Sequence, residues 1–167
     1  FLHKNTYLLD LGSVPGGWSQ VVAKKITNGK ILAIDIKPME KIEKVDFLRD
    51  DLLDSKVCEK IVAYFGKKID VIISDMATNT SGNKNLDSYK TGELCLRGMD
   101  LAQKILHRDG VFLSKLFMGS IFIEIHEKAN KYFKKVVKYK PLSSRKESKE
   151  IYIYCKGVQN SFNFTKV

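Results

Sequence analysis

Short apolar runs with the composition of β-strands alternate with longer segments of helical period along most of the chain. Such alternation is typical of a parallel sheet whose crossover helices cover both of its faces. The expected strands are residues 7–11, 30–34, 45–48, 69–73, 110–117, 136–139 and 150–155, and the expected helices are residues 18–26, 55–65, 88–106 and 122–133. We therefore predict an α/β fold built on one seven-stranded, mostly parallel sheet.

The length and composition of the chain are those of one soluble domain. Its 167 residues are 44% hydrophobic, which is enough to build a single core. We expect this domain to span residues 1–157 and a tail to follow at residues 158–167. The three cysteines, Cys58, Cys95 and Cys155, form no CxxC pair, so they predict neither a disulfide framework nor a zinc site and fit a reducing compartment. No apolar run reaches the roughly 18 to 20 residues that span a bilayer.

The charge of the chain is strongly basic. Lysine and arginine number 29 and aspartate and glutamate 19, which gives a formal net charge of +10. A balance of this kind favours a polyanionic partner. On charge alone, RNA, DNA and an anionic membrane surface all stay open, as does a lysine-rich surface that binds none of them.

A glycine-rich segment, DLGSVPGGW at residues 10–18, lies between the first expected strand and the first expected helix. Doubly wound sheets bind ligands at this place, and glycines there let the backbone approach a ligand closely. The spacing of Gly12, Gly16 and Gly17 does not match the GxGxxG pattern of dinucleotide sites. A nicotinamide cofactor is therefore disfavoured, and a nucleoside ligand without a pyrophosphate fits better.

Two carboxylates follow the next two expected strands. Asp35 ends the second strand, about 20 residues after the glycine segment, where a carboxylate can accept hydrogen bonds from both ribose hydroxyls of an adenosine. Asp51 follows the third strand and is placed to bind an adenine amino group. Either acid could instead cap the following helix, but their order and spacing after the glycine segment favour a nucleoside pocket.

Three segments of the chain carry a resemblance to a known family. LDLGSVPGGWSQ at residues 9–20, VDFL at residues 45–48 and SDMA at residues 74–77 resemble the RrmJ/FtsJ family of ribose 2′-O-methyltransferases. The likeness extends over residues 8–157. It implies the Rossmann-like fold of class I S-adenosylmethionine-dependent methyltransferases, in which the last strand is antiparallel. It also implies S-adenosylmethionine as cofactor, S-adenosylhomocysteine as product, and a reaction that requires no metal.

The resemblance also implies which residues bind the cofactor. The family equivalents of five residues line the S-adenosylmethionine pocket: Gly16, Trp18, Asp35, Asp51 and Asp75. For Trp18, the alternative is that its ring packs the following helix.

A ribose hydroxyl is a poor nucleophile, so it must be held in line with the methyl donor while its proton is removed. Asp75, Lys115 and Glu150 come from three expected strands and would meet at one edge of the sheet. Lys115 interrupts an apolar run and needs a partner, because lysine is almost never fully buried unless paired. The resemblance assigns the three to the family's catalytic set of lysine, aspartate, lysine and glutamate, of which they match the last three.

Two routes for the proton follow from this set. In the favoured route Lys115 is the general base, because burial, the sulfonium charge of the cofactor and a second lysine would lower its pKa. In the other route Lys115 stays charged and orients the hydroxyl, and Asp75 accepts the proton. Without the resemblance, Lys115 could be a surface lysine and Glu150 part of a solvated charge run.

The chain departs from the family pattern at two places. The first catalytic lysine of the family belongs to a helix upstream of the glycine segment, and Lys4 lies too close to the first strand to replace it. We therefore expect N-terminal residues of the protein to be missing from this sequence. Thr78 stands where the family usually has proline.

A cluster of basic residues close to Glu150 in sequence is expected to contact RNA phosphates. It consists of Lys131, Lys134, Lys135, Lys138, Lys140, Arg145, Lys146 and Lys149. The alternative is a solvated helix face without a partner.

The resemblance implies that the substrate is ribosomal RNA, at a uridine within the large ribosomal subunit. Transfer RNA and an mRNA cap are alternative substrates, and a non-catalytic RNA-binding module of the same fold is the alternative outside enzymology. Because no exposed apolar stripe is evident, we expect a monomer. We expect a cytoplasmic location, with an organellar address on a longer N-terminus as the alternative.

Overall fold

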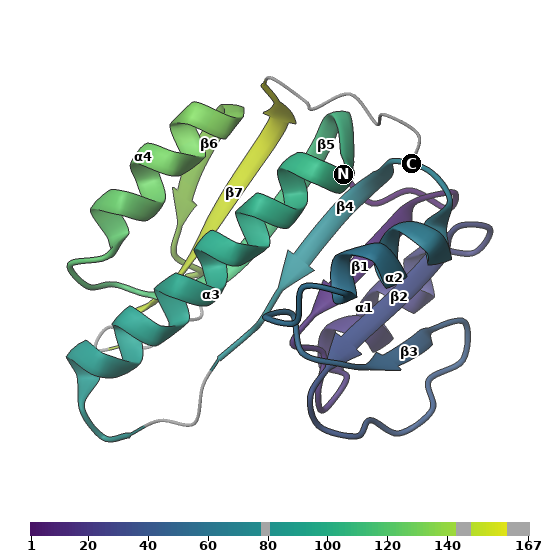
Figure 1. The fold of residues 1–167 in the computed structure, drawn as a ribbon, viewed down its shortest axis with the longest axis horizontal. Coiled ribbons are helices and arrows are strands. Elements are labelled where there is room, and N and C mark those ends of the chain that lie inside the picture. The colour runs from purple at the N-terminus through teal and green to yellow at the C-terminus, as the bar shows by residue number, and fades with distance from the viewer. Residues whose placement is uncertain (78–80, 143–147, 160–167) are drawn as a thin grey trace.

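The computed structural model of the protein describes residues 1–77, 81–142 and 148–159. Within these residues the chain forms seven strands and four helices (Figure 1). In chain order they are β1 (Tyr7–Leu11), α1 (Gly17–Lys25), β2 (Lys30–Asp35), β3 (Asp46–Arg49), α2 (Val57–Phe65), β4 (Ile69–Ser74), α3 (Lys84–Ile105), β5 (Leu106–Phe117), α4 (Phe122–Tyr132), β6 (Phe133–Tyr139) and β7 (Glu150–Val158). The order of elements expected from the sequence is confirmed.

The sheet has the strand order β3-β2-β1-β4-β5-β7-β6. Neighbouring strands from β3 to β5 are parallel, whereas β7 is antiparallel to both β5 and β6. The chain builds the sheet outward from β1 to β3 and then crosses back to add β4 on the other side of β1 (Figure 1). An open α/β sheet binds ligands where the strand order reverses in this way, outside the carboxyl ends of the strands.

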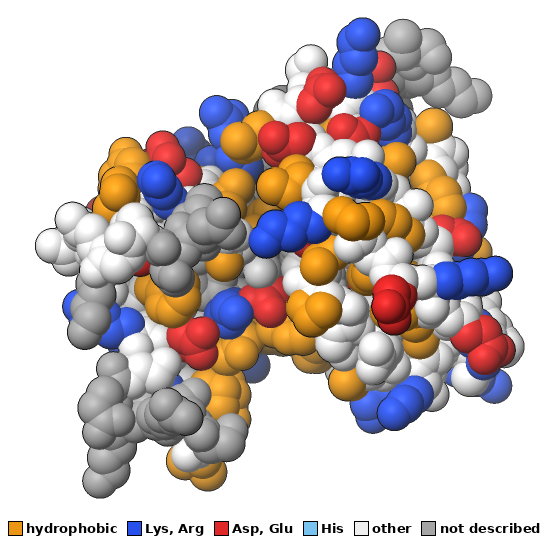
Figure 2. Space-filling view, turned by 90° about the horizontal axis from the view of Figure 1, so that it is seen from below, with side chains coloured by type: hydrophobic (Ala, Val, Ile, Leu, Met, Phe, Trp, Pro, Cys, Tyr) orange, Lys and Arg blue, Asp and Glu red, His pale blue; other side chains and the backbone are white. Residues whose placement is uncertain are grey.

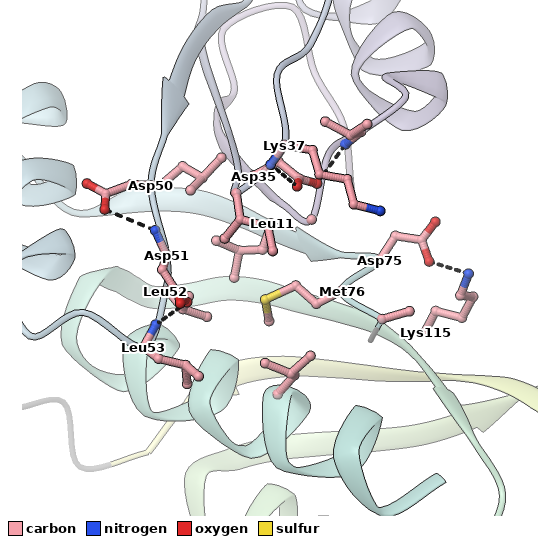
Figure 3. Close-up of a pocket in the computed structure, with 16 residues that line it drawn as sticks. Leu11, Asp35, Lys37, Asp50, Asp51, Leu52, Leu53, Asp75, Met76 and Lys115 are labelled. Carbon is pink, nitrogen blue, oxygen red and sulfur yellow. Dashed lines mark hydrogen bonds and ion pairs between the residues drawn. The ribbon is translucent and has the colours of Figure 1, made fainter. Parts of the chain in front are cut away.

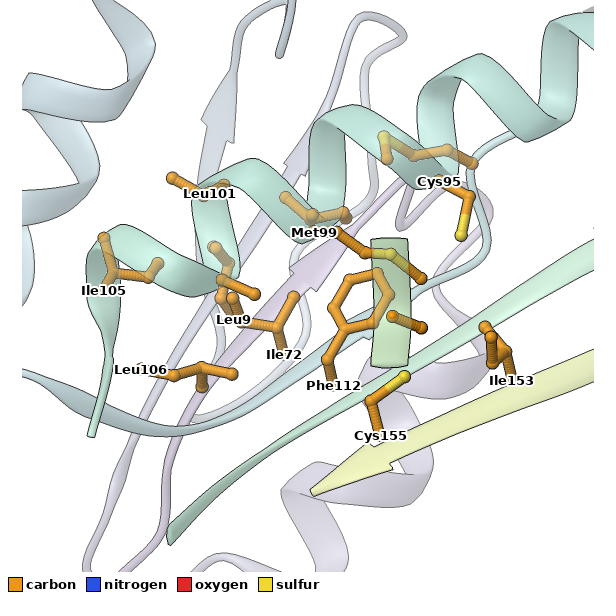
Figure 4. Packing of buried hydrophobic residues seen from close by; sticks show 14 of the residues in the cluster. Leu9, Ile72, Cys95, Met99, Leu101, Ile105, Leu106, Phe112, Ile153 and Cys155 are labelled. Carbon is orange, nitrogen blue, oxygen red and sulfur yellow. The ribbon is translucent and has the colours of Figure 1, made fainter. Parts of the chain in front are cut away.

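The two faces of the sheet are covered unequally. On one face, α2, α3 and α4 pack over the larger hydrophobic cluster, in which Met99 lies near Phe112 (Figure 4). On the other face, α1 contributes Val22 to a smaller cluster. Because alternate residues of a strand point to opposite faces, Leu8 belongs to the smaller cluster and Leu9 to the larger one. The face with α1 keeps a groove between that helix and the antiparallel strands.

Helix α3 begins earlier than the sequence predicted. It starts at Lys84, whereas the helix was expected to start at residue 88. The side chain of Asn83 accepts hydrogen bonds from the backbone N–H groups of Asn85 at 3.1 Å and Leu86 at 3.3 Å. Polar residues can begin a helix here because this cap satisfies N–H groups that have no partner within the helix.

Strand boundaries also differ from the expectation. β5 starts at Leu106 and not at residue 110, and Leu106 pairs with Ile69 before a register irregularity. β7 reaches Val158, which pairs with Phe133 at the start of β6, so the sheet includes the first residue of the expected tail. Residues 160–167 of that tail lie outside the described residues.

All three cysteines are free thiols. In the described parts of the chain, none of the helices combines the length and the apolar composition that crossing a membrane requires.

Candidate active site

The glycine segment forms the turn between β1 and α1 and is held against β2. The Gly12 N–H donates to the Ile34 carbonyl at 2.9 Å, and the Val14 N–H donates to the Asp35 carboxylate at 3.0 Å. Gly12 has a φ of 71°, and a Cβ at this position would lie 2.7 Å from Met76 Cα. Glycine therefore lets the turn lie directly against the chain that leaves β4.

A cavity of about 510 Å³ opens beside this turn (Figure 3). Three of the five residues predicted to bind the cofactor line it: Asp35, Asp51 and Asp75. Its apolar lining residues are Leu11, Val14, Ile34, Ile36, Leu52, Leu53, Met76, Ala77 and Leu94. A few convergent polar groups on an apolar wall are typical of sites for small organic ligands. Among the described residues, no three His, Cys, Asp or Glu side chains are arranged to hold a metal ion.

Backbone N–H groups orient two of these carboxylates. The Asp35 carboxylate accepts from Val14 and also, through its second oxygen, from the Lys37 N–H at 2.9 Å. The Asp51 carboxylate accepts from the Leu53 N–H at 2.9 Å. A carboxylate offers about four lone-pair sites, so each keeps acceptor capacity for a hydroxyl or amino group of a ligand.

Two of the five residues predicted for the cofactor lie outside this cavity. Gly16 is the N-cap of α1 with a φ of 109°, and a Cβ there would lie 2.7 Å from Ile42 Cδ1. Trp18 packs against the smaller hydrophobic cluster, and its ring stacks on Tyr152 with centroids 6.0 Å apart and an interplanar angle of 26°. The ring of Trp18 therefore lies between α1 and β7.

Lys115 lies at the rim of the cavity, close to Asp75 and Glu150, the other two residues predicted for catalysis. Its ammonium pairs with the Asp75 carboxylate (Figure 3) and lies 3.9 Å from a carboxylate oxygen of Glu150. We call Asp75, Lys115 and Glu150 the charged trio. Burial lowers the pKa of Lys115, but the pairing with Asp75 and the charge of Glu150 outweigh burial and raise the pKa above its ordinary value. Lys115 therefore carries its proton in this arrangement.

Strand register explains why the charged trio converges. The Asp75 N–H donates to the Leu11 carbonyl at 2.9 Å, which continues the pairing of β4 with β1. Lys115 pairs with Tyr152 across β5 and β7, and Glu150 begins β7 two positions earlier. Side chains of paired residues lie on the same face of the sheet, and so do residues two positions apart in one strand. Lys115, Tyr152 and Glu150 therefore share one face, and Lys115 reaches toward the start of β7. The edge at which β1 to β5 end carries acidic, basic and hydrophobic side chains close together (Figure 2).

Asp10 is a buried acid for which the sequence patterns predicted no role. It is fully buried in β1, and its carboxylate accepts from the Ser19 hydroxyl at 2.5 Å. Its other oxygen has no hydrogen-bond partner among the described residues. Burial raises the pKa of Asp10 to about 6; the Ser19 hydrogen bond opposes this shift, whereas the charges of Asp75 and Asp35 add to it. The signal was an acid inside an apolar strand, the kind of signal that singled out Lys115.

The register of β6 divides the predicted basic cluster into two groups. The near group, beside the start of β7, is Lys138, Lys140 and Lys149, and the far group is Lys131, Lys134 and Lys135. Lys135 pairs with Lys156, which at 3.3 to 3.4 Å per residue lies roughly 20 Å along β7 from Glu150. The near group lies closer along the strands to the charged trio, although Lys138 points to the other face of the sheet, where its ammonium lies 5.7 Å from the ring centroid of Phe122. Arg145, Lys146 and Thr78 lie outside the described residues.

Several solved structures with this fold are described as methyltransferases. A Streptococcus mutans protein described as a methyltransferase and solved in complex with SAH covers 93% of this chain and 88% of its own, with a TM-score of 0.58; at 16% identity the likeness is one of fold alone. A Plasmodium falciparum protein described as a ribosomal RNA methyltransferase covers 95% of this chain and 89% of its own, with a TM-score of 0.83 and 32% identity. The protein is a methyltransferase of the Rossmann-like fold.

The comparison of sequences gives the family. The model of the FtsJ-like methyltransferase family matches residues 1–158. The Ribosomal RNA large subunit methyltransferase E of Pelagibacter ubique is 46% identical over 149 residues, which are 89% of this chain and 73% of that relative. The chain belongs to the FtsJ-like methyltransferase family, and the resemblance read from its sequence is confirmed.

Proposed function

We propose that the protein transfers a methyl group from S-adenosylmethionine to a ribose 2′-hydroxyl of large-subunit ribosomal RNA, at a uridine. The observation that carries this proposal is the convergence of the charged trio at the rim of a cavity lined by Asp35 and Asp51. The ribosomal RNA named for both the Pelagibacter and the Plasmodium relatives supports the substrate class. The net charge of +10 supports a polyanionic substrate.

The residues of the cavity fit S-adenosylmethionine. Asp35 would accept hydrogen bonds from the ribose hydroxyls of its adenosine, and Asp51 from the adenine amino group. The apolar side chains between them, such as Leu52 and Ile36, would contact the base. When bound, S-adenosylmethionine supplies an electrophilic methyl group on a positively charged sulfur. Carboxylates beside the cavity favour a ligand of that charge.

Lys115 and Asp75 have complementary roles toward the 2′-hydroxyl in this proposal. The Lys115 ammonium donates a hydrogen bond to the hydroxyl oxygen and so directs a lone pair toward the methyl group. The Asp75 carboxylate would accept the hydroxyl proton as the carbon–oxygen bond forms and the methyl–sulfur bond breaks, with S-adenosylhomocysteine as the leaving group. Asp75 and, to a smaller extent, Glu150 raise the pKa of Lys115 and keep it charged. The raised pKa of Lys115 favours this route over the one in which Lys115 is the base.

Lysines of the near group would contact phosphates that flank the target nucleotide. Such contacts position the RNA backbone and carry no base specificity. Choice of the target therefore depends on RNA shape and context. A cytoplasmic monomer remains our expectation for the protein that does this.

Mass spectrometry of ribosomal RNA from cells with and without the protein tests the proposal. We expect one 2′-O-methyluridine of large-subunit RNA to disappear when the protein is absent. Transfer assays with S-adenosylmethionine on large ribosomal subunits, transfer RNA and capped mRNA then compare substrates. Transfer to tRNA or the cap alone would replace the proposed substrate, and cofactor binding without transfer to any RNA would indicate a non-catalytic RNA-binding module.

A further inference from the structure

We propose that Asp10 is a specificity-determining residue of the cofactor site, which in its ionised form favours S-adenosylmethionine over S-adenosylhomocysteine. The inference rests on the proposed function for the identity of the two ligands. It starts from a carboxyl group that the methyl-transfer steps above do not use. Asp10 is fully buried in β1, two residues before Gly12 of the glycine turn.

Strand register places Asp10 beside two of the carboxylates that line the cavity. Asp10 pairs with Ala33 of β2 and with Ile73 of β4. Asp35 lies two positions after the first of these partners and Asp75 two positions after the second, where its N–H still bonds to β1. Paired residues and residues two positions apart share one face of a sheet, so the three carboxylates lie on the same face. At about 4.8 Å between strands and 3.3 Å per residue, the Cα of Asp10 lies roughly 8 Å from each of the other two.

The cavity opens where these carboxylates meet. Leu11, which follows Asp10, pairs with both flanking strands and lies between Asp35 and Asp75 (Figure 3). Both of these acids and Leu11 line the cavity. A charge that enters the cavity and interacts with Asp35 and Asp75 therefore also acts on the buried carboxyl group next to Leu11.

The surroundings of Asp10 stabilise its neutral form only weakly. One carboxyl oxygen accepts from the Ser19 hydroxyl at 2.5 Å, and the other has no hydrogen-bond partner among the described residues. Burial raises the pKa of Asp10 to about 6, the Ser19 hydrogen bond lowers it, and the charges of Asp75 and Asp35 raise it further. Asp10 therefore changes its charge in the range where a nearby positive charge can shift the balance.

The charged groups around Asp10 come from the strands on either side of β1. Asp35 belongs to β2 and Asp75 follows β4, whereas α1 presents the uncharged hydroxyl of Ser19. Lys115 is one strand further away, on β5, and pairs with Asp75. A positive charge in the cavity acts on Asp10 in the direction opposite to the two carboxylates and favours its ionised form.

The two ligands differ in the charge on sulfur, which is positive in S-adenosylmethionine and neutral in S-adenosylhomocysteine. Asp10 releases its proton to solvent when the first ligand binds and takes up a proton from solvent once methyl transfer has removed the positive charge. The preference for S-adenosylmethionine is then complete above about pH 6 and is lost as the pH falls through this value. Ionised Asp10 thus helps the protein to retain the reactive cofactor and to release the product.

Calorimetry without RNA tests this inference. The full-length protein is titrated with S-adenosylmethionine, with S-adenosylhomocysteine and with sinefungin, whose amine carries a positive charge in place of the sulfonium. Each titration is made between about pH 5 and about pH 7.5 in pairs of buffers with different ionisation enthalpies. The experiment gives the Kd of each ligand and the number of protons that its binding releases.

Three variants assign the proton. Asp10→Asn removes the titrating group and keeps its size. Ser19→Ala removes the hydrogen bond that lowers the pKa of Asp10. Asp109→Asn is the matched control, because Asp109 is an exposed acid near the start of β5, at the other edge of the sheet.

In the wild type, we expect S-adenosylmethionine and sinefungin to release roughly 0.3 to 0.5 proton at about pH 5.5, and S-adenosylhomocysteine to release almost none. The ratio of the Kd of S-adenosylhomocysteine to that of S-adenosylmethionine should fall roughly three- to fivefold from about pH 7.5 to about pH 5. Asp10→Asn should abolish both effects, Ser19→Ala should move the proton release to higher pH, and Asp109→Asn should match the wild type.

A wild type in which both natural ligands release the same number of protons, or in which the Kd ratio does not change with pH, would overturn the inference whether or not a variant folds. Persistence of the effects in Asp10→Asn would assign them to another acid. Sinefungin that behaves like S-adenosylhomocysteine would show that the methyl group and not the charge is recognised. A wild type that shows the expected proton release but methylates no RNA would support this inference and overturn the proposed function, whereas one that binds neither natural ligand would overturn both.

Discussion

The cavity beside the glycine turn and the groove beside α1 differ in chemistry, although partly the same strands build both. The cavity carries carboxylates at or beyond strand ends, whereas the groove is lined mainly by apolar and aromatic side chains, several of them from inside strands. Inside a strand, a side chain must pack against its neighbours on the same face. At a strand end the chain leaves the ladder and can expose a polar group. One sheet therefore offers a polar site and an apolar support within a few residues of each other.

The largest effect is expected at Lys115, where the two regions meet. Lys115→Met keeps most of the side chain but removes the charge, and we expect the single-turnover rate to fall about 10³-fold. Lys115→Arg keeps a charge that cannot act as a base. If it retains much of the rate, the base role is excluded and Asp75 is the acceptor. Lys25→Met, at an exposed position in the last turn of α1, is the control and should leave the rate unchanged.

Asp10→Asn tests the buried carboxyl group of β1, which leads into the glycine turn beside the cavity. The pKa of Asp10 is about 6 in the folded protein against an ordinary 3.8, so the folded state binds this proton more tightly than the unfolded state does. Its contribution to the free energy of unfolding is therefore fully present below about pH 4 and is lost as the pH rises through 6. At 1.36 kcal/mol per pKa unit the loss is about 3 kcal/mol.

In the Asp10→Asn variant this loss should disappear. As the pH rises from 4 to 6, the free energy of unfolding should therefore fall less in the variant than in the wild type. Urea unfolding at several pH values measures the difference. Asp109→Asn, an exposed acid, is the control. Parallel curves for the wild type and Asp10→Asn would show that the carboxyl titrates alike in both states.

Asp35→Ala should change the cavity and leave the groove intact. Hydrogen bonds to a charged group are worth about 1.5 to 3 kcal/mol, so we expect the Kd of S-adenosylmethionine to rise roughly 10- to 100-fold. Calorimetry measures this Kd. Asp54→Ala is a matched control, because Asp54 is exposed and accepts from the Lys56 N–H in its own loop. An equal effect of both substitutions would count against a ligand at Asp35.

The smallest effect is expected from the lysines. Lys138→Gln combined with Lys149→Gln removes two charges of the near group and should weaken RNA binding several-fold. The slope of log affinity against log salt should decrease by roughly 1.5. Lys131→Gln combined with Lys135→Gln removes two charges of the far group and should change less. Fluorescence anisotropy between 50 and 200 mM salt measures both; a larger effect of the far pair would place the RNA at the other end of β6.

Much of the fold could be predicted because hydrophobic period and strand-end chemistry are local properties. Asp35 ends β2, as its place after an apolar run indicated. Lys115 pairs with a carboxylate, as expected for a charge inside an apolar run. The predicted start of α3 was wrong because its N-cap, Asn83, lies in a segment whose composition is that of a loop.

Trp18 was harder to place than the carboxylates. Its neighbour Tyr152 is far away in sequence, and the two meet only because β7 inserts between β5 and β6. The hydrophobic periodicity of the two segments does not indicate that β7 lies between β5 and β6. The motif around Trp18 correctly indicated the family, but a motif does not report which face of the sheet a ring occupies.

The close approach of Gly12 to Met76 fixes the separation between the glycine turn and the chain that leaves β4. Both sides of this contact are backbone, and Met76 directly follows Asp75. A change of side-chain rotamer elsewhere therefore cannot adjust the separation between the turn and the backbone of Asp75. Even one added carbon at position 12 would force the two strands to part. Because backbone atoms form this contact, side chains elsewhere in the cavity can change without altering the separation between the glycine turn and residue 75.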